Sequence, residues 1–153
     1  MAHRIYLDFD GTMTALNPKP EHGETITIDG EVMPILRAKW LDAKAQDENY
    51  EIIWASHREE DVHHFVNMLN EQCDQARITA PIPTFPHLTF TDPTGSKMKD
   101  IIAHYAENPC DYAVVFEDSL TTAEIKALTD AGLIVELFDN GIHQSTHHPE
   151  ESR

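Results

Sequence analysis

The sequence predicts an α/β fold, a three-layer sandwich in which helices cover both faces of a Rossmann-like, mainly parallel sheet. Short apolar runs of strand-forming residues alternate with segments whose apolar residues recur at helical spacing. Polar residues suited to chemistry follow several of the apolar runs, where the predicted strands end. The chain has 153 residues, which is enough for one domain with a substantial core and too few for two full domains.

The first predicted strand is the apolar run 5–7, and two aspartates follow it. Asp8 and Asp10 are two positions apart, so their side chains point the same way along an extended strand. Both can then face the crevice beyond the strand's carboxyl end, where open α/β sheets place their sites. Two carboxylates about 5 Å apart repel each other by roughly 3 kcal/mol at an effective dielectric constant of about 20. A cation is therefore expected between them. The next residue, Gly11, allows the backbone to turn after the strand.

A loop, a hairpin and a helix are expected next. Residues 12–24 contain prolines and a glycine without periodicity, which predicts a loop close to the site. Asp29-Gly30 lies between alternating residues and predicts a two-residue β-hairpin over 25–32, a small flap over the site. Pro34 is suited to the first turn of a helix that runs to about residue 46. The expected apolar face of this helix consists of Ile35, Leu36, Trp40 and Ala43.

A second buried strand is predicted over residues 50–56, and it ends in the hydroxyl of Ser56. Arg58 follows two positions later. The three acids 59–61 favour the start of a helix, because negative charge is stabilising near a helix N-terminus. Apolar residues at helical spacing continue this helix to Leu69.

The region before the next helix is irregular. Residues 77–86 hold three prolines, and 87–91 predict a short edge strand. Ser96 is suited to cap the N-terminus of the following helix. Lys97 then falls in its first turn, where a positive charge is unfavourable to the helix dipole, which suggests a task such as holding an anion. Lys99 is close enough to be the alternative for that task.

Another buried strand is predicted over residues 111–116, and two acids, Glu117 and Asp118, follow it. A helix over 121–131 and a last strand over 133–138 complete the predicted elements.

The predicted domain covers residues 1–139, and the polar, His-rich residues 140–153 are predicted to form a tail. His143, His147 and His148 resemble a metal-binding tract, but in a polar tail the favoured interpretation is that they have no ligand.

The context of the first two acids resembles a known family. The pattern Asp-x-Asp-Gly-Thr that begins at Asp8, after an apolar strand, is similar to the first motif of the haloacid dehalogenase-like (HAD) phosphohydrolases. The resemblance implies that Asp8 is a nucleophile and Asp10 a general acid/base. It also requires a hydroxyl ending a second strand, a lysine opening a later helix, and an acid after another strand. Ser56, Lys97 and Asp118 meet these three requirements in order.

This resemblance implies a Mg²⁺-dependent phosphomonoesterase that works through an aspartyl-phosphate. Mg²⁺ suits such a site because it is hard and prefers oxygen ligands. Ser56 and Lys97 would hold the phosphoryl oxygens, and Glu117 would be a helper or a water-mediated ligand. The chain has no room for the family's usual large cap, so the resemblance is to a nearly capless member. The implied metal ligands are Asp8, the backbone carbonyl of Asp10, and Asp118.

Two closer likenesses concern nucleic-acid ends. Residues 54–59, Trp-Ala-Ser-His-Arg-Glu, resemble the Ser-x-Arg-Glu of the 3′-phosphatase domain of phage-type polynucleotide kinases, which implies that Arg58 helps to hold the substrate. The Ile-Trp-Ala-Ser strand and the short length also look like the phosphatase-type domains of Swiss-army-knife RNA repair proteins. The implied substrate is a phosphorylated DNA or RNA end, with Thr12 as a second substrate contact. A small-metabolite or nucleotide phosphatase is the alternative.

Composition limits the partners and the setting. The chain has 27 acidic and 11 basic residues and a net charge of −16, which disfavours non-specific binding to nucleic acid or anionic membrane. Cys73 and Cys110 have neither disulfide-framework nor zinc-ribbon spacing. No apolar run approaches the length of a membrane span and no leader is evident, so a cytoplasmic setting is expected. The sequence leaves the oligomeric state open.

Three other functions remain as alternatives. A carbon–halogen hydrolase is disfavoured because a halide leaving group needs no proton from Asp10. A non-catalytic or regulatory phosphate-binding module is disfavoured because the carboxylates and Lys97 are intact. A receiver-like phosphoacceptor is disfavoured because such domains accept phosphate at a strand in the middle of the chain.

Overall fold

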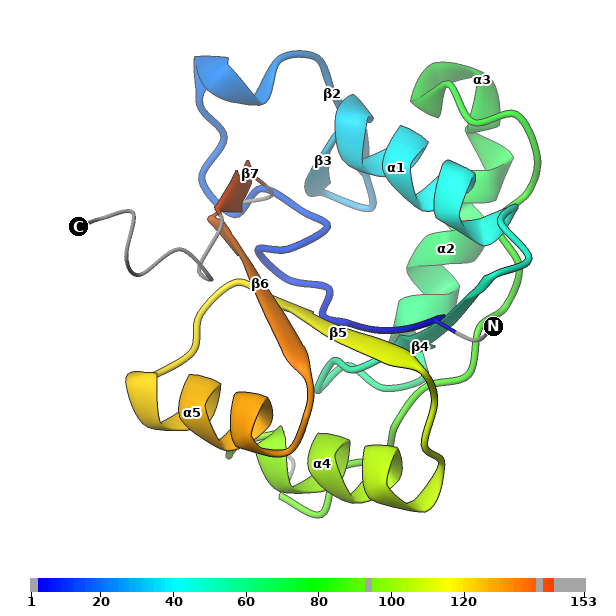
Figure 1. Ribbon diagram of the computed structural model, residues 1–153. Helices are drawn as coiled ribbons and strands as arrows, with labels where there is room; N and C mark the ends of the chain where they lie inside the picture. The colour runs from blue at the N-terminus through cyan, green and yellow to red at the C-terminus, as the bar shows by residue number, and fades with distance from the viewer. Residues whose placement is uncertain (1–2, 93–94, 140–141, 145–153) are drawn as a thin grey trace.

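A five-stranded sheet in the order β4-β1-β5-β6-β7 forms the middle layer of the fold (Figure 1). The computed structural model describes residues 3–92, 95–139 and 142–144. β1 is an inner strand and pairs in parallel with β4 and β5. β5 pairs in parallel with β6, and β7 joins β6 antiparallel. The strands are β1 (His3–Leu7), β4 (Tyr50–Trp54), β5 (Tyr112–Glu117), β6 (Ile134–Asp139) and β7 (Ile142–Gln144).

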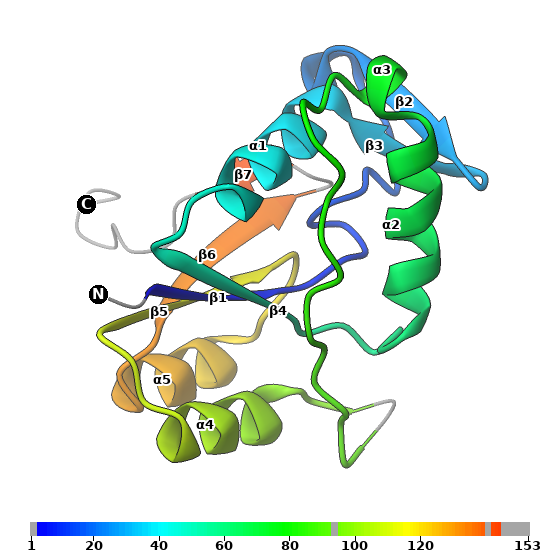
Figure 2. The same ribbon diagram turned by 90° about the vertical axis from the view of Figure 1, so that its right-hand side faces the viewer.

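Helices cover both faces of this sheet, as Figures 1 and 2 show. Ile5 and Leu7 of β1 face the layer of α1 and α2, whereas Tyr6 between them faces the layer of α4 and α5. This alternation is the two-residue period of a strand that is buried on both faces. The predicted three-layer α/β fold with a mainly parallel sheet is confirmed. The helices are α1 (Ile35–Ala45), α2 (Asp61–Glu71), α3 (Cys73–Ala76), α4 (Met98–Glu107) and α5 (Thr122–Asp130).

The predicted hairpin is also confirmed. β2 (Thr25–Ile28) and β3 (Glu31–Pro34) pair antiparallel around a two-residue turn. Asp29 and Gly30 in this turn both have positive φ, 51° and 78°, as a tight hairpin turn that follows the strand twist requires. The loop before the hairpin contains one 3₁₀ turn (Pro20–His22).

The apolar face of α1 differs from the predicted one. Leu36 is 69% exposed, and Ala43 is also exposed. The helix follows Pro34 directly, and its buried stripe runs through Ile35, Ala38 and Leu41. Leu36 lies about 100° around the helix from Ile35, so its side chain is off the buried stripe and faces solvent. Trp40, expected in the core, is half-buried and packs against Phe116 with their ring centroids 5.1 Å apart.

The predicted edge strand over 87–91 is wrong. In that segment only His87 makes a bridge, with Trp54 at the end of β4. The Trp54 N–H donates to the Pro86 carbonyl and the Trp54 carbonyl accepts from Leu88, both at 2.9 Å. The prolines upstream have no N–H to continue a ladder. Asn70 of α2 binds the backbone N–H and carbonyl of Ile82, so the proline-containing segment 78–90 lies between α2 and β4 (Figure 2).

The sheet continues past residue 139, because β7 lies within the expected tail. The side chain of His143, and all of His147 and His148, lie outside the residues whose contacts are described, and the division at 139/140 stays a prediction. Within the described ranges, no helix has both the length and the apolar character needed to cross a bilayer.

Candidate active site

The polar residues predicted from strand ends meet at one edge of the sheet. Asp8 follows β1, Ser56 follows β4, and Glu117 and Asp118 end and follow β5. The three strands are parallel neighbours, so their carboxyl ends lie together. Lys97 reaches the same place from the residue before α4.

Lys97 lies at the centre of the site and binds three oxygens. Its Nζ donates to Oδ1 of Asp8 at 2.9 Å and to the Ala55 carbonyl at 2.8 Å, and it forms an ion pair with Glu117. An ammonium group has three donors, so all of them are engaged. Burial alone would lower the pKa of Lys97, but Asp8 and Glu117 together raise it, so the lysine stays charged. Lys99, the alternative, is exposed on the surface of α4.

The helix that follows Lys97 begins one residue later than predicted. α4 begins at Met98, so the N-cap position is that of Lys97 and not of Ser96. The Ser96 hydroxyl accepts a long hydrogen bond from the Met98 N–H at 3.3 Å and donates to Glu124 at 2.9 Å. Lys97 therefore precedes the helix, with its side chain turned into the sheet edge and only 9% of the residue exposed.

Three carboxylates gather beside Lys97. One oxygen from each of Asp8, Glu117 and Asp118 lies within 4.8 Å of the others. Burial, and next the charge of Asp8, raise the pKa of Glu117 to about 9, although Lys97 opposes this rise. Burial and Asp8 also raise the pKa of Asp118 to about 6. The ionised acids are thus costly here, and a hard divalent cation such as Mg²⁺ fits this all-oxygen donor set.

Gly11 allows the loop after β1 to pass close to Asp118. Its φ is 76°, which is in the left-handed region. A β-carbon on Gly11 would lie 2.5 Å from Oδ2 of Asp118. Glycine is therefore required both for the turn and for the space that Asp118 occupies.

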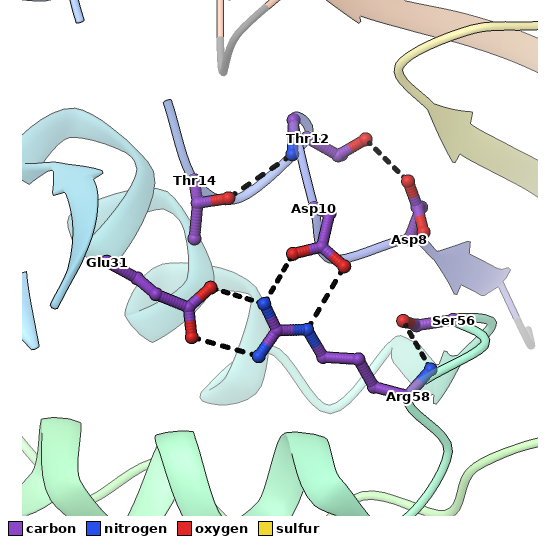
Figure 3. A network of polar contacts seen from close by, with 8 residues as sticks. Asp8, Asp10, Thr12, Thr14, Glu31, Ser56 and Arg58 are labelled. Carbon is purple, nitrogen blue, oxygen red and sulfur yellow. Dashed lines mark hydrogen bonds and ion pairs between the residues drawn. The ribbon is translucent and has the colours of Figure 1, made fainter. Parts of the chain in front are cut away.

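One threonine in the same loop contacts Asp8, and a second contacts the backbone of Gly11 (Figure 3). The Thr12 hydroxyl donates to Oδ2 of Asp8 at 3.3 Å, and the Thr14 hydroxyl accepts from the Gly11 N–H at 3.2 Å. Both threonines are buried. Asp8 is therefore held on one side by Thr12 and on the other by Lys97. The substrate contact expected of Thr12 stays a prediction.

The side chain of Asp10 pairs with Arg58 (Figure 3). The Arg58 Nη2 and Nε donate to the two Asp10 oxygens at 2.6 and 3.0 Å. The same guanidinium donates to Glu31 of β3, at 2.9 Å through Nη1 and through a shorter contact from Nη2. The Arg58 backbone N–H donates to the Ser56 hydroxyl at 3.1 Å. The hairpin thus reaches the site through Glu31, as expected of a flap.

Glu31 is the site residue that the sequence analysis missed. The hairpin was predicted and Arg58 was singled out, but the pairing of a strand-end arginine with a hairpin acid depends on how the flap folds back. An acid directly after the Asp29-Gly30 turn, in a chain with few arginines, was the available signal. The side chains of Arg58 and Glu31 are 30% and 25% exposed, so this pair lies at the open side of the site.

No protein-family model matches the chain, and no curated protein matches it. Among solved structures, the chain is similar to the crystal structure of D,D-heptose 1.7-bisphosphate phosphatase from B. bronchiseptica complexed with magnesium and phosphate. The identity is 14%, the match covers 92% of this chain and 83% of that chain, and the TM-score is 0.47.

Proposed function

We propose that the protein is a Mg²⁺-dependent phosphomonoesterase of the haloacid dehalogenase type. One observation carries this proposal: Asp8, a buried carboxylate, is held between Thr12 and Lys97 and adjoins Glu117 and Asp118 at the carboxyl edge of a parallel sheet. A carboxylate held in this way suits nucleophilic attack, and the neighbouring charges suit the stabilisation of a phosphoryl group.

Asp8 attacks phosphorus in the proposed reaction and forms an aspartyl-phosphate as the bond to the leaving oxygen breaks. Asp10, protonated and released from one of its two Arg58 contacts as the substrate binds, gives a proton to the leaving oxygen. It then takes a proton from the water that hydrolyses the aspartyl-phosphate, which releases phosphate and restores Asp8. The Asp10 side chain is 41% exposed, and it lies at the open side where a leaving group and water have access.

Mg²⁺ would be held by Asp8, Asp118 and the backbone carbonyl of Asp10, with Glu117 close behind, and would supply positive charge against the phosphoryl oxygens. Ser56 and Lys97 would bind the remaining oxygens. Because Lys97 has no free donor, it must exchange one contact, and Glu117 is the partner it can release when the Glu117 carboxyl is protonated. A phosphoryl oxygen of the substrate thus takes the place of Glu117 on Lys97.

The proposed substrate is a nucleic-acid end that carries a 3′-phosphate. The support is the Ser-x-Arg-Glu segment and the position of Arg58 at the open side of the site, where Glu31 of the hairpin contacts it. A small-metabolite phosphatase is the alternative, and a cavity of about 180 Å³ between the loop and the hairpin favours it. That cavity is lined by neutral residues and Glu31, with no lysine or arginine to hold a polyanion.

The test is Mg²⁺-dependent phosphate release from a 3′-phosphorylated oligonucleotide beside a small aryl phosphate, with Asp8→Asn as the control. Release from both substrates that is lost in Asp8→Asn supports the mechanism, and much higher efficiency on the oligonucleotide supports the end-processing role. Release from the aryl phosphate alone directs the search to metabolites. Retained activity in Asp8→Asn removes Asp8 as the nucleophile.

A further inference from the structure

A second cavity lies away from the active site, between α1 and the strands beneath it. Its volume is about 320 Å³, which is within the range of small-ligand pockets. We call it the α1 groove. Its defining residues are Arg37, Trp40 and Lys44 of α1, Phe116 of β5 and Phe138 of β6.

Arg37 is a buried cation that lacks an acidic partner among the described residues. It is 8% exposed, and its Nε has no hydrogen-bond partner there. The guanidinium carbon lies 4.5 Å from the ring centroid of Trp40 and 4.2 Å from that of Phe138. Its one polar contact within residues 3–92, 95–139 and 142–144 is a weak one from Nη2 to the sulfur of Met13, at 4.0 Å. Burial lowers the pKa of Arg37 to about 10, so it remains charged at neutral pH.

The burial of the Arg37 charge lowers the stability of the protein unless an anion binds beside it. A buried charge without a counter-charge is strongly unfavourable, and the faces of two rings compensate only part of the loss of water. The protein has a net charge of −16, yet no described carboxylate is within ion-pair distance of Arg37. Nε is unpaired but enclosed within the wall of the groove, so an anionic ligand in the groove would meet the positive charge that the guanidinium carries there.

The rest of the groove supplies aromatic surface and a second cation. Lys44 lies seven residues after Arg37, about 10 Å further along the same helix face, with its Nζ 4.1 Å from the ring centroid of Tyr50. Trp40 lies between the two cations. Glu136 is the acid among the lining residues, and it has interactions of its own.

We propose that the α1 groove is a binding site for a small organic anion with a flat aromatic ring. The acid group of the ligand pairs with the guanidinium of Arg37, and the ring packs against Trp40. Lys44 adds favourable charge at the other end. The site does not depend on the catalytic carboxylates, so the proposal is independent of the phosphatase function.

The test uses 2-naphthoate as the probe and ¹⁵N-labelled protein. The Nε–H signal of Arg37, assigned by its loss in Arg37→Met, reports directly on the unpaired donor. We expect saturable shifts of this signal and of the indole N–H of Trp40, whereas the indole of Trp54, which is 1% exposed, stays in place. The uncharged 2-naphthamide should bind at least about tenfold more weakly, because it lacks the negative charge.

Matched variants distinguish binding in the α1 groove from the effect of removing a positive charge elsewhere on α1. Arg37→Met should remove the preference for the carboxylate without loss of stability, because it replaces an unpaired buried charge by an apolar chain. Lys39→Met, an exposed lysine on the same helix, should bind the probe as the original protein does. If Arg37→Met does not fold, Lys44→Met tests the same preference. Equal affinity for carboxylate and amide, or no saturable shift at millimolar probe, overturns the proposal.

Discussion

Arg58 binds both carboxylate oxygens of Asp10, at 2.6 and 3.0 Å. The same guanidinium binds Glu31, so one arginine joins the proposed general acid/base to the hairpin. A phosphoryl substrate that approaches Arg58 competes with Glu31 for it. The hairpin contact and the substrate contact are therefore alternatives, and release of Glu31 is part of substrate entry in the proposed mechanism.

The first prediction concerns Arg58. Arg58→Met should lower kcat/KM by about 100-fold or more, which is the order expected when a donor that orients the reacting groups is lost. The melting temperature should change little, because the side chain is partly exposed. Arg77→Met removes a more exposed pair with Glu24 and should leave kcat/KM unchanged. Steady-state kinetics on the aryl phosphate decides the matter, and equal kinetics in the two variants would contradict the role of Arg58.

The second prediction concerns Gly11. Gly11→Ala should abolish activity and weaken Mg²⁺ binding at least about tenfold, because the new β-carbon displaces Asp118. Gly23→Ala is the matched control, since Gly23 also has a positive φ of 68° but has nothing within 4 Å of the added carbon. Both variants should also lose about 1–3 kcal/mol of stability from backbone strain, because Gly11 and Gly23 each have a positive φ. Mg²⁺ titration calorimetry distinguishes them, and equal Mg²⁺ affinity in both would rule out the proposed clash.

The third prediction separates the two lysines. Lys97→Met leaves Asp8 and Glu117 buried without their cation, so we expect a loss of about 3 kcal/mol in the free energy of unfolding and no measurable turnover. Lys99→Met, on the exposed side of α4, should match the original protein in both measurements. Urea denaturation and phosphate release provide the two readouts. Turnover lost in Lys99→Met but kept in Lys97→Met would reverse the assignment.

The fourth prediction concerns pH. The pKa of Glu117 is raised from 4.5 to about 9 in the folded protein, and that of Asp118 from 3.8 to about 6. The folded state then binds more protons than the unfolded state, so both groups stabilise the metal-free protein at low pH. This stabilisation is lost as pH rises through about 6 and then about 9. The free energy of unfolding in urea without Mg²⁺ should therefore fall from pH 5 to pH 9.

Two variants and a Mg²⁺ titration test whether Glu117 causes this pH dependence. Glu117→Gln should flatten the fall above pH 6, whereas Glu107→Gln, an exposed acid, should leave it as it is. Mg²⁺ binds the ionised carboxylates, so its apparent affinity should rise over the same pH range. A metal-free stability that rises between pH 6 and 9 would show that Glu117 is ionised in the folded protein.

The sequence predicted the sheet, the hairpin and the strand-end residues because these depend on local patterns. Asp8, Ser56 and Asp118 follow apolar runs, and parallel strands bring their ends together whatever the rest of the chain does. The pairing of Arg58 with Glu31 depended on how the flap folds back, which no local pattern encodes. The exposed Leu36 shows the same limit, since hydrophobicity alone does not fix the rotation of a helix on its sheet.

The burial of Arg37 could not be predicted from the sequence for a related reason. A charged residue in an amphipathic helix is normally assigned to solvent, and here the helix rotation turns it inward between Trp40 and Phe138.

The proline-containing segment 78–90 has a consequence for how copies of this chain meet. β4 is the last strand on its side of the sheet, and such a strand offers unpaired N–H and C=O groups to any extended chain nearby. The segment occupies the groups of Trp54 there, and Asn70 holds it in place through both backbone groups of Ile82. Since proline cannot donate a hydrogen bond, the outer side of this segment is a poor template for a further strand. Pairing with a further strand is thereby obstructed at the Trp54 end of β4.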